Sequence, residues 1–288
     1  MNLKGHIKNW LSPYPRIRRF VRLVWLGRRP ADLIRHLRDE RFRRDCYKRF
    51  QSGDHRVFRH FAGYECEYDA ISPKNYWHLS IASQHEDSFM SRLFRDHVRH
   101  GMLVLDIGGH VGMWAVPLAK HVGPTGRVYV FEPEPEGYAA ILRNAELNHL
   151  ENITPLRLAL SDLSGTASFY IRPDKDTHSL FEETLAPSPS GRQDVHTIEV
   201  STVDDLVDHK VIAPPNFVKI DVEGAELRVL DGMKRSAAGI DCLLVEIHAE
   251  ELMLHGVRDP HAAVEKKVVT LGFPNHQYVD AIHLLATR

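Results

Sequence analysis

A glycine-rich turn between a strand and a helix is the feature that most constrains the fold of this chain. The block LVLDIGGHVG at 103–112 begins as an apolar strand that reaches Asp106. It continues through Gly108, Gly109 and Gly112 into sequence typical of a helix. Glycines at such a turn let the backbone approach a ligand without obstruction by side chains. The block therefore predicts the ligand-binding end of a parallel α/β sheet.

A second strand, at 128–131, ends in Glu132. An acid at the tip of the strand that follows a glycine-rich turn is placed to bind ribose hydroxyls. The dinucleotide-binding version of this turn begins with a glycine at the place where this chain has Asp106. A carboxylate there would repel a pyrophosphate but suits the ammonium of a methionine-like group. The pattern favours S-adenosylmethionine over NAD.

From residue 102 onward, segments typical of strands and helices alternate, which predicts an α/β, Rossmann-like sheet with helices on both faces. We expect strands at 102–106, 127–132, 154–160, 216–221 and 242–248, and helices near 112–121, 135–148, 223–233 and 260–271. Residues 161–206 interrupt this pattern and are interpreted as an inserted β-hairpin with a loop rich in Ser, Pro and Gly at 184–191.

The chain as a whole divides into three predicted parts. Residues 1–50 form a basic helical extension, 51–100 a strand pair and helix that serve as substrate wall or lid, and 101–288 the main domain with its inserted loop at 161–206. The strand pair is indicated by Tyr64, Cys66 and Tyr68, which alternate with acidic residues. Ser83 and Glu86 resemble a capping box at the start of the helix.

Charge is distributed very unevenly along the chain. Residues 1–50 contain 15 Lys and Arg against 4 Asp and Glu, although the net charge of the whole chain is −1. The apolar residues of 17–25 have helical spacing, so this arm could lie on an anionic membrane or hold a phosphorylated carrier. It could equally pack against the acidic body or a partner subunit, which leaves a homodimer open.

The expected location is cytoplasmic, with peripheral membrane association through 1–50 left open. The polar start of the chain does not resemble a secretory signal, and the apolar stretch at 20–27 is too short to span a bilayer. Three widely spaced cysteines, Cys46, Cys66 and Cys242, fit a reducing compartment.

Two further blocks bring acids and a histidine to neighbouring strand ends. FVKIDVEGAELRVLDGM at 217–233 contains an apolar strand that ends at Asp221, followed by Glu223 and Glu226 at the start of a helix. CLLVEIH at 242–248 ends in Glu246 and His248, which would share one face of a strand. Ligands bind beyond the carboxyl ends of strands in open sheets, so Asp221, Glu246 and His248 are the candidate catalytic residues. Glu223 and Glu226 are interpreted as first-turn acids that stabilise the helix.

Taken together, these blocks resemble the FkbM-type S-adenosylmethionine-dependent methyltransferases. The resemblance covers residues ~100–250 and includes VFEPEP with a following Asn144 and Asn148, STVDDL at 201–206, KIDVEGAE at 219–226 and VLDGM at 229–233. The chain has GGH at 108–110 where the family more often has GAN. Residues 1–60 carry no motif of the family.

The resemblance implies a cofactor site and a class of reaction. Asp106, Gly108 and Gly112 would hold the methionine part of S-adenosylmethionine, Glu132 would bind the ribose, and Ser161 with Asp162 would lie near the adenine. We place Gly109 and Pro133 in the same site. The resemblance also implies that the chain is an O-methyltransferase acting on hydroxyls of polyketides, sugars or glycans.

Methylation of a hydroxyl needs alignment of the acceptor and removal of its proton. His248 is the first candidate base, because an unperturbed imidazole titrates near neutral pH. Asp221 or Glu246 could orient it or act as the base. Alternatively, Mg²⁺ held by Asp221 and another carboxylate could acidify the hydroxyl.

The expected acceptor is a small hydroxylated molecule, and a sugar is preferred over a polyketide. Many acids, histidines and aromatic residues such as Tyr76, Trp77 and Tyr170 suit a polyol. A nucleic-acid methyltransferase is less favoured, because the body is acidic and no stacking platform is recognisable. A non-catalytic binding protein is the remaining alternative.

Overall fold

The computed structural model describes residues 30–81, 84–171, 178–179 and 194–288. The chain forms two compact units, Met1–Asp54 and His55–Arg288. In the first unit, α3 (Pro30–Gln51) is a helix of 22 residues. The apolar residues at 17–25, Ser83 of the capping box and the loop at 184–191 lie outside the described residues. No helix in the described ranges has the length and hydropathy that crossing a bilayer requires.

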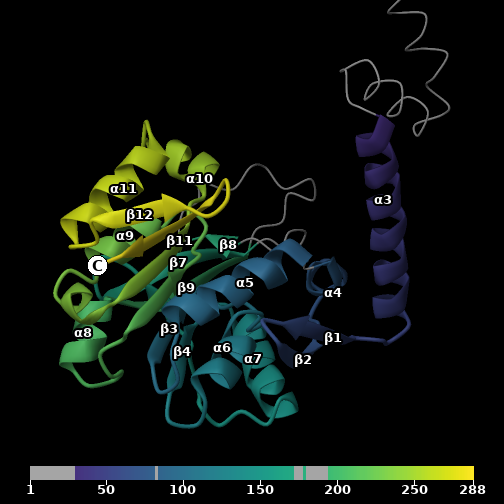
Figure 1. Ribbon diagram of the computed structural model, residues 1–288, viewed down its shortest axis with the longest axis horizontal. Helices are drawn as coiled ribbons and strands as arrows, with labels where there is room; N and C mark the ends of the chain where they lie inside the picture. The colour runs from purple at the N-terminus through teal and green to yellow at the C-terminus, as the bar shows by residue number, and fades with distance from the viewer. Residues whose placement is uncertain (1–29, 82–83, 172–177, 180–193) are drawn as a thin grey trace, which may run out of the picture. The chain divides into compact units, whose positions relative to one another are not determined.

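A seven-stranded, mostly parallel sheet forms the centre of the second unit (Figure 1). Its order is β12-β13-β11-β10-β3-β4-β5, and its two antiparallel pairs are β11 with β13 and β13 with β12. The strands are β3 (Leu103–Ile107), β4 (Arg127–Phe131), β5 (Ile153–Leu156), β10 (Phe217–Ile220), β11 (Cys242–Glu246), β12 (Asn275–Tyr278) and β13 (His283–Thr287). The order reverses between β3 and β10, and ligands bind in open α/β sheets at such a point.

Helices follow the parallel strands as the alternation predicts, and the Rossmann-like α/β fold is confirmed. They are α6 (Ala115–Val122), α7 (Pro135–Leu147), α8 (Val203–Asp208), α9 (Glu226–Asp231), α10 (Ala249–Leu254) and α11 (Pro260–Thr270), with a 3-10 turn at Ser236–Gly239. Alternate strand residues such as Leu105, Val218 and Leu243 form one buried cluster with Val229 of α9 and Val264 of α11. This packing fixes the strand ends that carry the polar side chains.

A hairpin and two helices precede the main sheet. They are β1 (Arg56–Phe61), β2 (Tyr64–Asp69), α4 (Pro73–Ile81) and α5 (Gln84–His97). Asn144 on α7 accepts the Asp69 N–H at 2.7 Å, and the side chain of Asn148 binds both backbone groups of Glu67. The two asparagines therefore attach β2 to the main domain.

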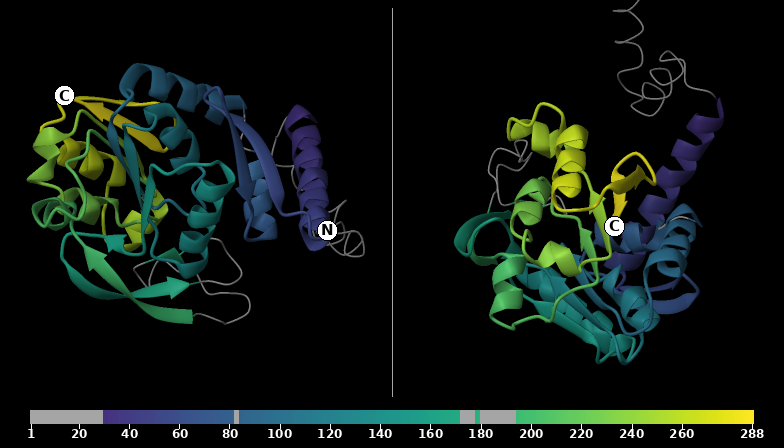
Figure 2. Two further views of the ribbon diagram at one scale, coloured as in Figure 1. Left: turned by 90° about the horizontal axis from the view of Figure 1, so that it is seen from below. Right: turned by 60° about the vertical axis from the view of Figure 1, so that its left-hand side comes forward.

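A four-stranded sheet of order β6-β9-β7-β8 accounts for the inserted segment. Its strands are β6 (Ala159–Leu160), β7 (Gly165–Ile171), β8 (His178–Ser179) and β9 (Asp194–Ser201). All of β7 pairs antiparallel with residues 194–200 of β9, which is the predicted hairpin (Figure 2). In the STVDDL block, Thr202 caps α8 by accepting the Asp205 N–H at 2.9 Å.

Four predicted element boundaries were wrong. The strand expected at 154–160 is two short strands in different sheets, β5 and β6. The strand expected at 242–248 ends at Glu246, and His248 is instead the N-cap residue of α10. The helix expected at 223–233 covers only Glu226–Asp231, because Glu223 and Gly224 have φ of +48° and +96° and form a turn. The helix expected from 112 begins at Ala115. β12 and β13 were not predicted.

Candidate functional site

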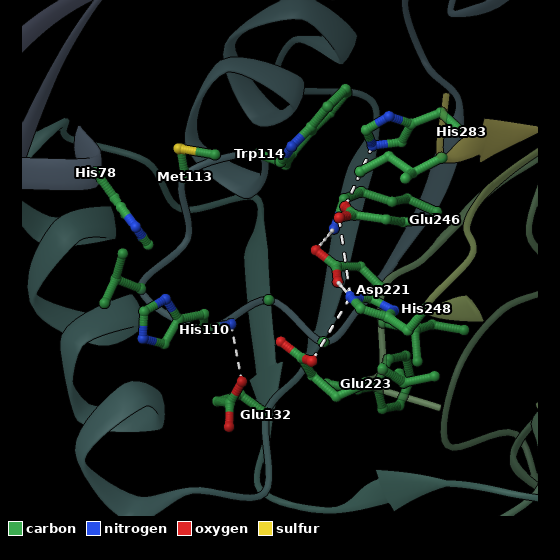
Figure 3. A pocket seen from close by; sticks show the side chains of 18 of the residues that line it. His78, His110, Met113, Trp114, Glu132, Asp221, Glu223, Glu246, His248 and His283 are labelled. Carbon is green, nitrogen blue, oxygen red and sulfur yellow. Dashed lines mark hydrogen bonds and ion pairs between the residues drawn. The ribbon is translucent and has the colours of Figure 1, made fainter. Parts of the chain in front are cut away.

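A cavity of about 600 Å³ lies beyond the carboxyl ends of β3, β4, β10 and β11. Figure 3 shows Glu132 on one side of it and Asp221, Glu246 and His248 on the other. The predicted residues that line it are Gly108, Gly109, Glu132, Pro133, Asp221, Glu246 and His248. The structure therefore brings the strand-end residues from four strands around one space large enough for a small ligand.

The packing of the protein leaves no room for side chains at Gly108 and Gly109. A Cβ on Gly108, which has φ +84°, would lie 1.7 Å from the carbonyl oxygen of Asp221, and a Cβ on Gly109 would lie 2.1 Å from Val130. The turn can therefore pass closely between β10 and β4 only with glycine at these two positions. Gly112 is also in the left-handed region, with φ +83°, but does not line the cavity.

Glu132 is a buried acid with both oxygens already held by backbone groups. The His110 N–H donates to Oε2 at 2.8 Å, and the Glu134 N–H donates to Oε1 at 2.9 Å. Burial outweighs these hydrogen bonds and raises the pKa of Glu132 to about 8. A carboxylate oxygen has two lone pairs, so each oxygen can still accept a hydroxyl. In its ionised form Glu132 is thus a fixed acceptor pair on the cavity wall.

Asp106 lies inside the protein, below the cavity wall. Its side chain is fully buried and forms an ion pair with Lys219 at 3.3 Å. Burial raises the pKa of Asp106 even though the Lys219 ammonium opposes that effect. The predicted contact of Asp106 with a methionine-like group stays a prediction, and Lys219 is the group of this pair that lines the cavity.

Lys219 was not predicted as a site residue, although a lysine inside the apolar strand FVKI is an unusual feature of the sequence. Lysine is almost never fully buried unless it is paired. Here the ammonium also lies 3.1 Å from Oδ2 of Asp221 and 5.7 Å from the centre of the Trp114 ring. Lys219 therefore links the acid of β3 with the acid that follows β10.

His248 faces a group of carboxylates at the end of β11. Its Nε2 lies 3.6 Å from Asp221, 3.7 Å from Glu223 and 3.8 Å from Glu246. Asp221 is not the cap of α9, because Ala225 occupies that position. The side chains of Glu246 and His248 therefore come together because the chain turns into α10 after Glu246. The prediction that both residues lie on one face of a strand was wrong.

The electrostatics of this group favour a protonated imidazole in the ligand-free protein. Burial alone would lower the pKa of His248, but the hydrogen bond to Glu226 and the charges of Glu223 and Asp221 raise it to about 10. Burial raises the pKa of Glu223 to about 7. Although burial opposes it, the Lys219 and His248 charges lower the pKa of Asp221. The imidazole is consequently a much stronger base than an unperturbed histidine.

Glu226 and His283 also belong to the site. From the sequence, Glu226 was interpreted as a first-turn acid of a helix, and His283 was not predicted. Glu226 is fully buried, and its Oε1 lies 2.6 Å from Nδ1 of His248. His283 Nε2 lies 3.2 Å from Glu246 Oε2, and its Nδ1 lies 2.7 Å from Asp280. His283 begins β13, a strand that was not predicted, so no pattern pointed to it.

Asp221, Glu246 and His248 also offer ligand atoms within 4.8 Å of one another. Two carboxylates and an imidazole are a donor set that suits several divalent cations. Both carboxylates already have partners within the protein, because Asp221 pairs with Lys219 and Glu246 with His283. The geometry allows a metal at this place without requiring one.

Aromatic residues form part of the remaining cavity wall, and one of them, Phe89, comes from α5. The ring centres of Phe89 and Trp114 lie 5.9 Å apart, and Phe89 lies 5.5 Å from the His283 ring. Tyr76, Trp77 and Tyr170 are not among the residues that line the cavity, so the aromatic residues chosen from the sequence were the wrong ones. Ser161 is buried and Asp162 exposed, joined by a 2.9 Å hydrogen bond. Ala159 and Leu160 line the cavity beside them.

Comparison with known proteins gives a consistent family match. The model of the methyltransferase FkbM domain matches residues 106–267. A hexuronic acid methyltransferase of Haloferax volcanii, AglP, is 29% identical over 190 residues, which are 65% of this chain and 72% of that protein. The 31-O-demethyl-FK506 methyltransferase FkbM of Streptomyces tacrolimicus is 27% identical over 179 residues, or 52% of this chain and 67% of that protein.

Among solved structures, a methyltransferase FkbM from Methylobacillus flagellatus is similar with a TM-score of 0.44 at 14% identity. The alignment covers 90% of this chain and 60% of that one. A methyltransferase from Aquifex aeolicus is similar with a TM-score of 0.37 and 16% identity, over 65% of this chain and 81% of that one.

Proposed function

The chain belongs to the methyltransferase FkbM domain family, and from this premise we propose that it transfers the methyl group of S-adenosylmethionine to a hydroxyl of a sugar. The family makes it an S-adenosylmethionine-dependent methyltransferase. Transfer to a hydroxyl is supported by one observation. The cavity has an acceptor pair at Glu132 on one side and a basic imidazole at His248 on the other.

The residues on the Glu132 side fit the methyl donor. Glu132 retains a lone pair on each oxygen for the two ribose hydroxyls, and Gly108 and Gly109 leave the loop backbone open to the cavity. Ser161 and Asp162 follow two lining residues and are proposed to lie near the adenine. Asp106 would contribute to the methionine site through Lys219, which lines the cavity, and Gly112 through the conformation of the loop. When bound, S-adenosylmethionine supplies an electrophilic methyl group on a positively charged sulfonium.

His248 is proposed as the general base. A second positive charge in the cavity disfavours an imidazolium, so His248 would lose its proton more readily beside a sulfonium. The acceptor hydroxyl then gives its proton to Nε2 as its oxygen is methylated. Asp221 and Glu246 stabilise the imidazolium that forms, since both carboxylates lie within 4 Å of Nε2. Such base catalysis typically contributes about 10²–10⁴-fold.

A sugar acceptor is supported by the chemistry of the opposite wall. Phe89 and Trp114 form an apolar corner beside Asp221, Glu246 and His283, so one wall suits a pyranose face and the other its hydroxyls. The relative named a hexuronic acid methyltransferase favours the same class. A polyketide hydroxyl is the second candidate, favoured by the relative that acts on 31-O-demethyl-FK506.

The test is transfer of a labelled methyl group to free hexuronic acids, neutral hexoses and a macrolactone with a free hydroxyl. Label that enters a sugar and resists mild alkali supports a methyl ether, and label released by alkali identifies a methyl ester on a carboxylate instead. We expect His248→Asn to abolish transfer and His276→Asn, at an exposed position of β12, to leave it unchanged. Loss of transfer with EDTA would contradict His248 as the base and would favour activation of the hydroxyl by a metal held at Asp221.

A further inference from the structure

Glu226 is the buried acid that the proposed mechanism has not used. It is the first residue of α9 and is completely buried. Its Oε1 accepts the Gly224 N–H at 3.1 Å and lies 2.6 Å from Nδ1 of His248, while Oε2 has no hydrogen-bond partner among the described residues. A buried carboxylate with one oxygen left without a partner costs stability, which suggests a role beyond holding the start of α9.

We propose that Glu226 is a positioning residue that holds a proton on Nδ1 of His248 and thereby leaves Nε2 as the proton acceptor. The inference rests on the proposed function, in which His248 takes the acceptor proton. The alternative is that Glu226 only stabilises the start of α9, as a first-turn acid does.

The hydrogen bond sets both the rotation and the protonation of the ring. The contacts of Nε2 with Asp221, Glu223 and Glu246 are 3.6–3.8 Å long, beyond ordinary hydrogen-bond length. The Glu226 contact is therefore the short one that fixes the ring. An ionised carboxylate only accepts, so Nδ1 must donate, and in the neutral imidazole the lone pair is then on Nε2. Figure 3 shows the Nε2 edge of the His248 ring directed at the carboxylates of Asp221, Glu223 and Glu246.

This arrangement balances the transfer step. The acceptor O–H bond breaks and an Nε2–H bond forms, while the new O–CH₃ bond forms as the S–CH₃ bond breaks. The resulting imidazolium lies between Glu226 at Nδ1 and the carboxylates near Nε2. Glu226 thus acts through His248 and does not touch the acceptor.

The first test is spectroscopic and needs no acceptor. In protein labelled with ¹⁵N-histidine and studied above pH 10, where the imidazole is neutral, His248 should give a low-field proton signal coupled to Nδ1 and none coupled to Nε2, assigned by its loss in His248→Asn. Glu226→Gln should abolish that signal, whereas Glu250→Gln should keep it. Glu250 is a matched control, because it is an exposed first-turn acid of the short helix α10. A wild-type signal that is absent or coupled to Nε2, or one that persists in Glu226→Gln, overturns the proposal.

The second test is kinetic. Glu226→Gln should lower kcat by about 10²–10⁴-fold, the usual contribution of general acid–base catalysis, whose upper end matches the loss of the orienting carboxylate in a catalytic triad. The affinity for S-adenosylmethionine should stay unchanged, and Glu226→Asp, which keeps the carboxylate, should recover part of kcat. A loss of cofactor affinity and thermal stability without a specific loss of kcat would show a structural role only. If no acceptor is methylated by the wild type, the proposed function fails, and the ¹⁵N experiment still decides the role of Glu226.

Discussion

The Lys219 ammonium lies 3.3 Å from Oδ1 of Asp106, and both side chains are at most 2% exposed. The same ammonium lies 3.1 Å from Oδ2 of Asp221. A pair of charges removed from water in this way contributes little net stability, but removing one partner leaves the other charge buried and unpaired. Because Asp106 precedes the glycine turn and Asp221 precedes Glu223, Lys219 connects the two loops that form the cavity floor.

We therefore expect Lys219→Met to destabilise the protein by about 3–5 kcal/mol, the usual cost of breaking a buried ion pair. Urea unfolding of the wild type and the variant measures this difference. The double variant Lys219→Met with Asp106→Asn should be more stable than Lys219→Met alone, because the orphaned carboxylate is then neutral. If the double variant is less stable than the single one, the ion pair does not explain the burial of Lys219.

A second prediction concerns the packing of the glycine turn. Gly108→Ala would place a Cβ 1.7 Å from the Asp221 carbonyl oxygen at a backbone φ of +84°, so β3 and β10 would have to separate. We expect a loss of several kcal/mol, in the range of severe core mutations. Gly239→Ala is the control, because its Cβ would meet its nearest neighbour only at 4.0 Å. Thermal unfolding of both variants tests the prediction, and equal stability would contradict it.

The positions of the central parallel strands in the sequence were predictable, because each of these strands is apolar and is followed by a polar end. The blocks around Asp106, Glu132 and Asp221 carry both signals, and all three segments form strands at the expected places. β12 was not predictable in this way. Its residues NHQY are all exposed, so neither alternation nor an apolar run marks it as a strand.

The site was predictable only where it lies at strand ends. Glu132 and Asp221 follow directly from that rule. Glu226 was interpreted as a first-turn acid, because nothing in the sequence shows that the turn at Glu223 and Gly224 directs its side chain inward to His248. His283 could have been predicted only from the pairing of β13 with β11, which places it opposite Glu246. Such pairings depend on tertiary packing and leave no local pattern.

A third prediction concerns cofactor binding and pH. Burial raises the pKa of Glu132 to about 8, so below that pH the ligand-free protein holds this carboxyl in its protonated form. The ionised form is the better acceptor of ribose hydroxyls. Affinity for S-adenosylmethionine should therefore rise with pH and level off above 8, with a limiting slope of about tenfold per pH unit. Calorimetric titration between pH 6 and 9 measures it. Glu132→Gln should bind weakly and lose this dependence, and an unchanged pH dependence would show that another group titrates.

The last prediction separates the charges around His248 by their effect on the pH profile. Burial alone would lower the pKa of His248, but Glu226, Glu223 and Asp221 raise it to about 10. Glu246 also faces the ring, 3.8 Å from Nε2. A base must be neutral to act, so kcat/KM should increase with pH from 7 to 9. Glu223→Gln removes one of these charges, which lowers the pKa of His248 and should shift the rising limb toward lower pH by about one unit.

The shift should appear above pH 7, because burial raises the pKa of Glu223 itself to about 7 and the wild-type side chain is neutral below that pH. Initial rates at saturating S-adenosylmethionine and a limiting acceptor concentration measure both profiles, because saturation with the cofactor removes the pH dependence that Glu132 gives to its binding. Lys266→Gln, a change of charge on α11 away from the lining residues, should leave the profile unchanged. A limb that stays in place in Glu223→Gln, or moves to higher pH, would mean that the ionisation seen in the rate does not belong to His248.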